Sequence, residues 1–190
     1  ALFKKDFSAN YISEYNNEFL DETTIEKSLS SIDIFLRPYN VTNIYYDIIL
    51  GATNTYTNLK YTLNCRNFFF VNSGKVEITL CPPKNFKYLY INNYDEQLEY
   101  CSLIDINNVD DVYKKDFDKV KFLRVILLPE QLIQIPAYWF YSIKLLEENS
   151  IVFSFKYRTF MNSLAISPQL FTKFLQDNNI KRNVTKIVDA

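Results

Sequence analysis

The stretch Asn67–Cys81, which reads NFFFVNSGKVEITLC, decides the expected fold. Its first half is an aromatic run, and apolar and polar residues alternate from Lys75 to Cys81. Such alternation is typical of a strand with one buried face, and Asn72-Ser73-Gly74 between the two runs is a turn signal. We therefore predict two strands, Asn67–Asn72 and Lys75–Cys81, paired as an antiparallel hairpin.

Strand patterns continue on both sides of this stretch. Asn43–Leu50 is rich in Ile and Tyr, whereas Asn92–Lys121 is polar and predicts loops with short helical turns. Strands are predicted again at Lys121–Leu128, Leu132–Ile135, Tyr141–Leu146 and Ile151–Tyr157. About eight short strands that do not alternate with helices favour a jelly roll over an α/β fold.

Helices are predicted at both ends of the chain. Ser8–Tyr39 reads as mostly helical, because a capping signal at Thr23-Thr24-Ile25-Glu26 precedes an apolar face and Pro38 follows it. That apolar face consists of Ile25, Leu29 and Ile32. Ser167-Pro168 begins a second predicted helix, which runs to about Asp177.

These patterns predict one domain over residues 1–190. It comprises a helical N-terminal region (1–40), a β core (41–160), and a C-terminal helix and tail (161–190). The hydrophobic share of 48% supplies ample core material for a chain of 190 residues. A formal net charge of -1 gives no reason to expect nucleic acid as a partner.

Hydropathy, cysteine content and glycine content limit where the protein is located and how its backbone turns. No apolar run reaches the ~20 residues of a membrane span, so no membrane association is expected. Three widely spaced cysteines indicate buried thiols in a reducing compartment. Only two glycines occur, Gly51 and Gly74, which suggests that each meets a backbone need.

Several motifs occur in an order and at spacings that are shared with a known family. They are Ile49-Leu50-Gly51, Asn67-Phe68-Phe69, Gly74, Leu80-Cys81-Pro82-Pro83, Leu89-Tyr90 and Ile135-Pro136-Ala137-Tyr138-Trp139. With these motifs the chain resembles a cupin-type JmjC domain. The resemblance implies a mainly β fold, the double-stranded β-helix or cupin jelly roll, with flanking N- and C-terminal helices. In that family, two His and one carboxylate hold Fe(II), and 2-oxoglutarate serves to hydroxylate or demethylate proteins.

The chain contains no histidine, which conflicts with the chemistry of that family. Carried over from the family motifs, the three metal-ligand positions fall on Tyr61, Leu63 and Tyr141, and the basic residue that anchors 2-oxoglutarate falls on Val76. Two tyrosines without imidazole or carboxylate make a poor Fe(II) site. We therefore expect no catalytic residues, no metal and no cofactor. Tyr61 and Tyr141 either fill the former pocket or line a small-molecule site.

The absence of histidine also excludes Ser-His-Asp and Cys-His hydrolysis. Two glycines cannot build a dinucleotide loop. The first hypothesis is a non-catalytic structural or protein-interaction module. The bias toward Asn, Ile, Lys, Tyr and Phe fits an AT-rich genome, so this module is a candidate minor capsid or internal component of a large DNA virus. The alternatives are a ligand-binding pseudoenzyme that uses the former pocket, and an active oxygenase with an unusual metal site.

The aromatic content predicts protein partners. The chain has 16 Phe and 15 Tyr, more than one small barrel readily hides, so an exposed apolar patch is expected. The candidate segments are the N-terminal region with Phe3, Phe7, Tyr11 and Tyr15, and the C-terminal helix with Phe171 and Phe174. We expect a homo- or hetero-oligomer located in the virion or the host cytoplasm.

Overall fold

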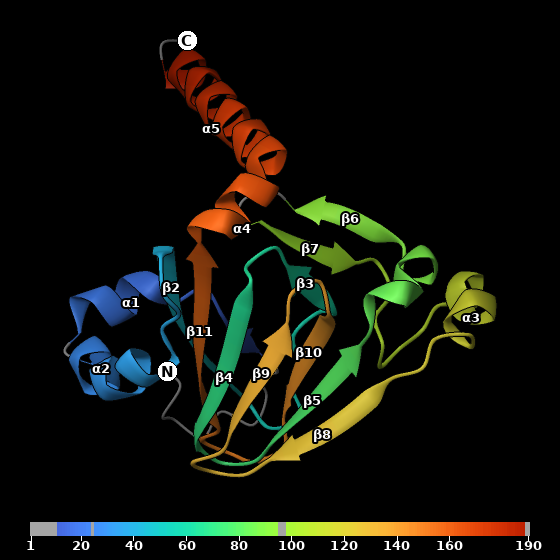
Figure 1. Cartoon of the computed structure of the whole chain (residues 1–190). Helices are drawn as coiled ribbons and strands as arrows, with labels where there is room; N and C mark the ends of the chain where they lie inside the picture. The colour runs from blue at the N-terminus through green and yellow to red at the C-terminus, as the bar shows by residue number, and fades with distance from the viewer. Residues whose placement is uncertain (1–10, 24, 95–97, 189–190) are drawn as a thin grey trace.

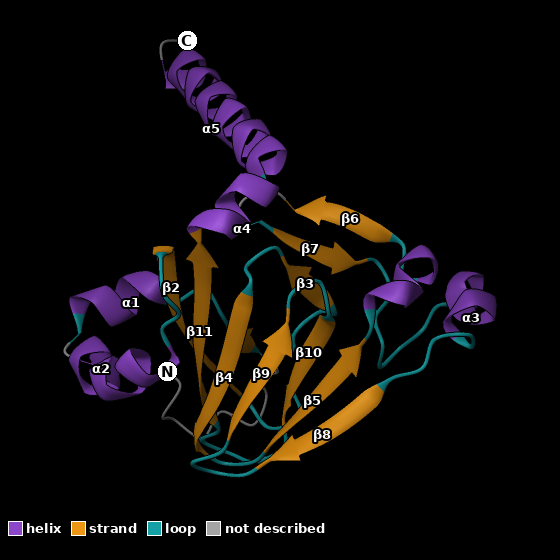
Figure 2. Ribbon diagram, viewed as in Figure 1, coloured by secondary structure: helices purple, strands orange, loops and turns teal. Residues whose placement is uncertain are grey.

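Two antiparallel sheets face each other and form a jelly roll in the computed structural model, which describes residues 11–23, 25–94 and 98–188 (Figures 1 and 2). The first sheet has the order β1 (Ile12–Ser13), β2 (Val41–Gly51), β11 (Ile151–Thr159), β4 (Arg66–Ser73) and β9 (Leu132–Pro136). The second has the order β6 (Ile91–Tyr94), β7 (Glu99–Ser102), β3 (Lys60–Thr62), β10 (Phe140–Leu145), β5 (Val76–Cys81) and β8 (Leu123–Leu127). The predicted mainly β fold, a cupin jelly roll with helices at both ends, is confirmed.

The strands of the deciding stretch form, but their predicted pairing is wrong. β4 belongs to the first sheet, where it lies between β11 and β9, and β5 belongs to the second, between β10 and β8. Gly74 carries the chain from one sheet to the other with a φ of +74°. A Cβ at this position would lie 2.6 Å from the Cα of Ser150, so both its conformation and its space require glycine.

The core has one interior cluster and two outer ones. The interior cluster joins residues of both sheets, such as Phe69 and Val71 of β4 with Ile78 of β5 and Ile143 of β10. A second cluster lies outside the second sheet, and the third lies between the first sheet and the N-terminal helices. The strands therefore bury side chains on both faces, which explains their long apolar runs.

Helices lie on the outside of the barrel and at its upper end, and the last helix extends away from it (Figure 2). They are α1 (Asn17–Glu22), α2 (Ile25–Leu36), the 3₁₀ helix η1 (Pro83–Tyr88), α3 (Asp111–Phe117), α4 (Phe160–Ala165) and α5 (Ser167–Val188). The predicted apolar face of α2 packs against the first sheet with Leu29 buried, and the helix ends before Pro38 as expected. No helix within the described ranges is long and apolar enough to cross a membrane.

Two segments differ from the sequence prediction, and a third cannot be compared with it. The region expected as loops with short helical turns contains the helix α3 but also the hairpin of β6 and β7, in which the polar residues Glu99 and Ser102 are buried. The C-terminal helix continues to Val188 instead of ending near Asp177. Residues 1–10, with Phe3 and Phe7, lie outside the described residues.

Left-handed backbone occurs at eight non-glycine residues of the described part. These are Tyr15, Asn40, Asn54, Tyr90, Leu98, Glu130, Tyr138 and Asn149. Glu130 occupies the tight turn between β8 and β9, where it has a φ of +67°. Asparagine tolerates this conformation better than other side chains do, but Glu, Leu and Tyr gain no such advantage.

Candidate functional site at the barrel mouth

The pairing of β10 with β3 fixes which side chains enter the barrel. Tyr141 lies directly opposite Lys60, and directly opposed residues of an antiparallel pair share one face of the sheet. The Tyr141 ring is fully buried in the interior cluster, 5.1 Å from the ring of Phe69 in the first sheet. Lys60 and Thr62 are therefore the interior positions of β3.

Tyr61 and Leu63 face away from the interior, in the cluster outside the second sheet. The Tyr61 ring stacks on Tyr100 at 4.9 Å and meets the edge of Phe140 at 4.8 Å. Tyr61 and Tyr141 thus do not line one pocket, which corrects that alternative. The family motif placed the ligand positions on Tyr61 and Leu63, which is one residue away from the side chains of β3 that point into the barrel.

Val76, the position of the former 2-oxoglutarate anchor, is fully buried among apolar side chains of the interior cluster. Its neighbour across β10 is Leu145 and its neighbour across β8 is Leu127. This location leaves no polar group at which a carboxylate could be held.

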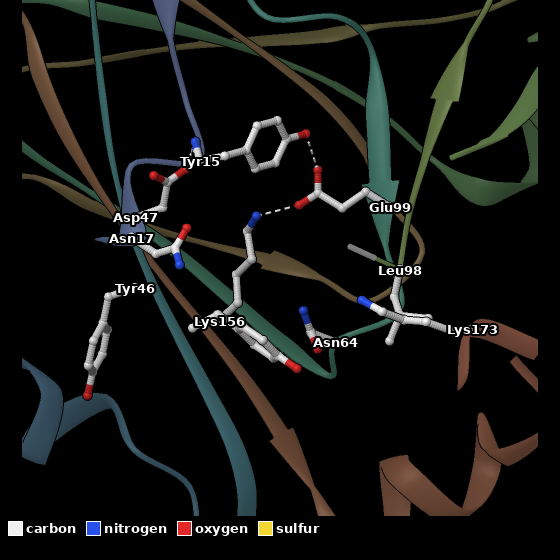
Figure 3. A pocket seen from close by; sticks show the side chains of 10 residues that line it. Tyr15, Asn17, Tyr46, Asp47, Asn64, Leu98, Glu99, Lys156 and Lys173 are labelled. Atoms are coloured by element: carbon white, nitrogen blue, oxygen red, sulfur yellow. Dashed lines mark hydrogen bonds and ion pairs between the residues drawn. The ribbon is translucent and has the colours of Figure 1, made fainter. Parts of the chain in front are cut away.

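A buried network of charges occupies the interior next to Tyr141. The Lys60 ammonium donates to Glu14 Oε2 at 2.6 Å and to the Tyr15 hydroxyl at 2.8 Å, and it lies 3.0 Å from Glu99 Oε2. Lys156 of β11 donates to the other oxygen, Glu99 Oε1 (Figure 3). Glu99 therefore bridges a lysine of each sheet.

Mutual attraction keeps this network charged despite its burial. Burial by itself raises the pKa of Glu99, but Lys156 and Lys60 outweigh it and hold that pKa at about 2. Burial opposes the charged form of Lys60 as well, yet attraction by Glu99 and the neighbouring groups raises its pKa well above its usual value. Both groups are therefore ionised at neutral pH.

The segment 12–16, here called the N-terminal strap, contacts this network. Asp47 of β2 accepts hydrogen bonds from the backbone N–H groups of Tyr15 at 3.0 Å and Asn16 at 2.7 Å. The Tyr15 hydroxyl donates to Glu99 Oε2 at 2.9 Å. These contacts hold Tyr15 at a φ of +67°, a conformation that costs about 1–2 kcal/mol for a non-glycine residue.

A cavity of about 210 Å³ opens beside the network, at the end of the barrel near α5 (Figure 3). We call this end the barrel mouth. The walls of the cavity come from the strap, α1, β2, β7, β11 and α5, and from the segments that precede β4 and β7. The lining residues are Tyr15, Asn17, Tyr45, Tyr46, Asp47, Asn64, Leu98, Glu99, Lys156 and Lys173. The cavity wall therefore combines polar and apolar surface and carries lysines from two elements.

The comparison with protein families agrees with this architecture. The sequence matches the family described as Cupin-like domain over residues 5–163. The chain belongs to this family. Among solved structures, the cupin-like domain is similar to KdgF from Halomonas sp., with 10% identity, a TM-score of 0.37, and coverage of 60% of this chain and 69% of that one. A comparison with curated proteins returns no match.

The residues of the barrel interior do not fit the Fe(II) centre that the JmjC resemblance implies. Where ligands would project inward stand Lys60, a cation, and Tyr141, a phenol whose pKa burial raises well above its usual value. Within the described residues, no three His, Cys, Asp or Glu side chains gather in a way that could hold a metal ion. The two glutamates nearby already neutralise lysine ammonium groups.

Sequence reasoning did not single out the residues of this network. Glu99 lies in a segment that reads as a loop, and Glu14 is remote from Lys60 in sequence. Lys156 did carry a usable signal, because it interrupts the apolar run Ile151–Tyr157 of a strand with two buried faces. A lysine at such a position predicts a buried carboxylate partner.

Proposed function

We propose that this cupin-like domain is not an enzyme and acts by binding other proteins in an oligomeric assembly. Two features support the proposal. The charged network takes up interior space next to Tyr141, and the C-terminal helix α5 extends away from the barrel (Figure 1). The exposed apolar surface of α5 is the observation that carries the proposal.

That surface has the spacing of a helix interface. Phe171, Phe174 and Leu175 recur three and four residues apart and so share one face of α5. Phe171 and Phe174 are each 62% exposed. On α4, Phe160, Met161 and Leu164 are also exposed. Exposed large apolar residues gathered on one helix are typical of a partner surface.

Sedimentation velocity at micromolar concentration tests this assignment. We expect the wild type to sediment as an oligomer and the double variant Phe171→Ser/Phe174→Ser to sediment as a monomer. Val112→Ser on α3, where Val112 is 83% exposed, serves as the control for loss of an exposed apolar side chain and should leave the oligomer intact. A monomeric wild type, or an oligomer insensitive to the double substitution, would contradict the proposal.

The absence of enzymatic function has its own test. We expect no stoichiometric iron in the purified protein, and no succinate release when it is incubated with iron and 2-oxoglutarate. The donor set supports this expectation, since the Lys60 ammonium cannot ligate a metal and Val76 has no charge with which to hold a carboxylate of 2-oxoglutarate. Iron at one equivalent, or measurable succinate, would favour an active oxygenase instead.

The specific setting that we propose is a minor capsid or internal component of a large DNA virus, present in the virion or the host cytoplasm. The jelly-roll fold, common in particle proteins, and the AT-rich character of the composition support it. Quantitative mass spectrometry of purified particles against infected-cell cytosol would test it. Absence from both fractions would refute this setting.

The cavity at the barrel mouth favours a second candidate, a pseudoenzyme that binds a small ligand. The cavity has room for a small organic molecule, because a water molecule takes about 30 Å³ of liquid volume. NMR titration with small anionic, neutral and cationic compounds would test it. Binding of any class should shift the amide signals of Asn64 and Leu98; if no class does, this candidate fails.

A further inference from the structure

Arg158 is a buried cation without a carboxylate partner in the described part of the chain. It is only 4% exposed, and it follows Lys156 by two residues on the interior face of β11. Its Nε and one Nη donate to a single acceptor, Asn64 Oδ1, at 3.2 Å each. Its guanidinium also lies over the Tyr45 ring, 5.4 Å from the centroid.

The contacts of Arg158 with Asn64 and Tyr45 do not neutralise the positive charge of its guanidinium. An amide oxygen accepts hydrogen bonds but carries no net charge, and a buried arginine is almost always paired with an anion. A guanidinium has five donors in a planar fork, of which Asn64 engages two. Arg158 therefore has both charge and hydrogen-bonding capacity available for an anionic group.

The position of Arg158 connects it to the cavity. Asn64 forms part of the cavity wall, and Arg158, which is not itself a lining residue, donates to its side chain at 3.2 Å. Lys156 and Tyr45 line the same cavity. The acidic groups on that wall are already engaged: Glu99 bridges two lysines, and Asp47 accepts backbone N–H groups of the strap. An anion beside Asn64 and Lys156 would thus lie close to a second cation that no carboxylate neutralises.

We propose that Asn64, Lys156 and Arg158 form a subsite for the carboxylate or phosphate group of a small ligand at the barrel mouth. This inference rests on the second candidate function and names its ligand class. The subsite lies on β11 and the segment before β4, whereas the anchor position carried over from the family is Val76 on β5. Because Arg158 is buried, only a small anionic group that enters the cavity can use its charge.

Isothermal titration of the full chain with malonate and with phosphate tests the subsite and distinguishes the two oxyanions. We expect at least one to bind the wild type, and Arg158→Gln to weaken its binding about tenfold or more, as the loss of a charged hydrogen-bonding group implies. Arg158→Lys, which keeps the charge, should restore much of the affinity. Urea unfolding of both variants identifies any loss that reflects misfolding.

The outcomes separate this inference from the candidate function. Binding that Arg158→Gln weakens and Arg158→Lys restores supports the subsite. Oxyanion binding that is equal in wild type and Arg158→Gln overturns the subsite but leaves the ligand-binding candidate intact. Failure of both oxyanions to bind also overturns the subsite, and the NMR titration with neutral and cationic compounds then decides the candidate.

Discussion

Tyr141 and Lys60 stand directly opposite each other in the pairing of β10 with β3, and both side chains enter the barrel. The Lys60 ammonium has three polar neighbours, whereas the buried Tyr141 hydroxyl has no hydrogen-bond partner among the described residues. The polar group of Lys60 is thus fully engaged by its neighbours, whereas the hydroxyl of Tyr141 is buried without a hydrogen bond to any described residue.

Tyr141→Phe should therefore stabilise the fold. Removing a buried hydroxyl without a partner removes its desolvation cost, so we expect the free energy of unfolding to rise by about 1 kcal/mol. Tyr157→Phe is the matched control, because the Tyr157 hydroxyl donates to Asp33 Oδ1 at 2.8 Å and its loss should destabilise by about 1–3 kcal/mol. Urea unfolding measures both. Equal destabilisation by the two substitutions would reveal a partner for Tyr141.

Lys60→Met should be strongly destabilising. The substitution leaves Glu14 without its lysine and Glu99 with one lysine instead of two. Removal of one member of a buried ion pair typically costs about 3–5 kcal/mol. Lys114→Met, which breaks an exposed pair with Asp111, should give no measurable change. Chemical denaturation compares the two variants, and similar midpoints would argue against an energetic role for the network.

Stability should fall in acid because of Glu99. Its pKa is about 2 in the folded protein, below the ordinary value of 4.5, so the unfolded chain binds the proton more readily. The stabilisation is present above the unfolded pKa and is lost as pH falls from about 4.5 toward 2. Urea midpoints measured across this range should decline in the wild type and decline less in Glu99→Gln. Parallel pH profiles would show that other carboxylates control acid unfolding.

Gly74→Ala should disrupt the crossing between the sheets. The left-handed backbone costs about 1–2 kcal/mol for a side chain, and the contact with Ser150 adds to that cost, so we expect a loss of at least 2 kcal/mol. Gly74→Asn isolates the steric part, since Asn tolerates the φ of +74° but not the contact. Thermal unfolding that leaves Gly74→Asn near the wild type would assign the requirement to φ alone.

The architecture was accessible from sequence because it depends on local patterns. Alternation from Lys75 to Cys81 and the apolar face of α2 each identify one element. Pairing was not accessible: the turn signal at Gly74 is the same whether the chain returns along one sheet or crosses to another. The hairpin of β6 and β7 was missed because its strands are short and buried positions of β7 carry the polar residues Glu99 and Ser102.

The candidate site was less accessible still, because its location depends on strand phase. A shift of one residue moves every side chain of a strand to the other face, so the count that landed on Tyr61 missed Lys60. The network also joins residues that are far apart in sequence, such as Glu14 with Lys60 and Glu99 with Lys156. No local pattern encodes those contacts.

The left-handed residues offer an opening for protein engineering. Glu130, in the tight turn between β8 and β9, is exposed, and glycine would adopt its φ of +67° without steric cost. Glycine removes a conformational cost of about 1–2 kcal/mol in the folded protein. This gain exceeds the loss of about 0.4–1 kcal/mol that arises because glycine gives the unfolded chain more conformational entropy. Because the chain has few glycines, substitution of glycine at such left-handed turn residues is a route by which directed evolution could raise its thermal stability.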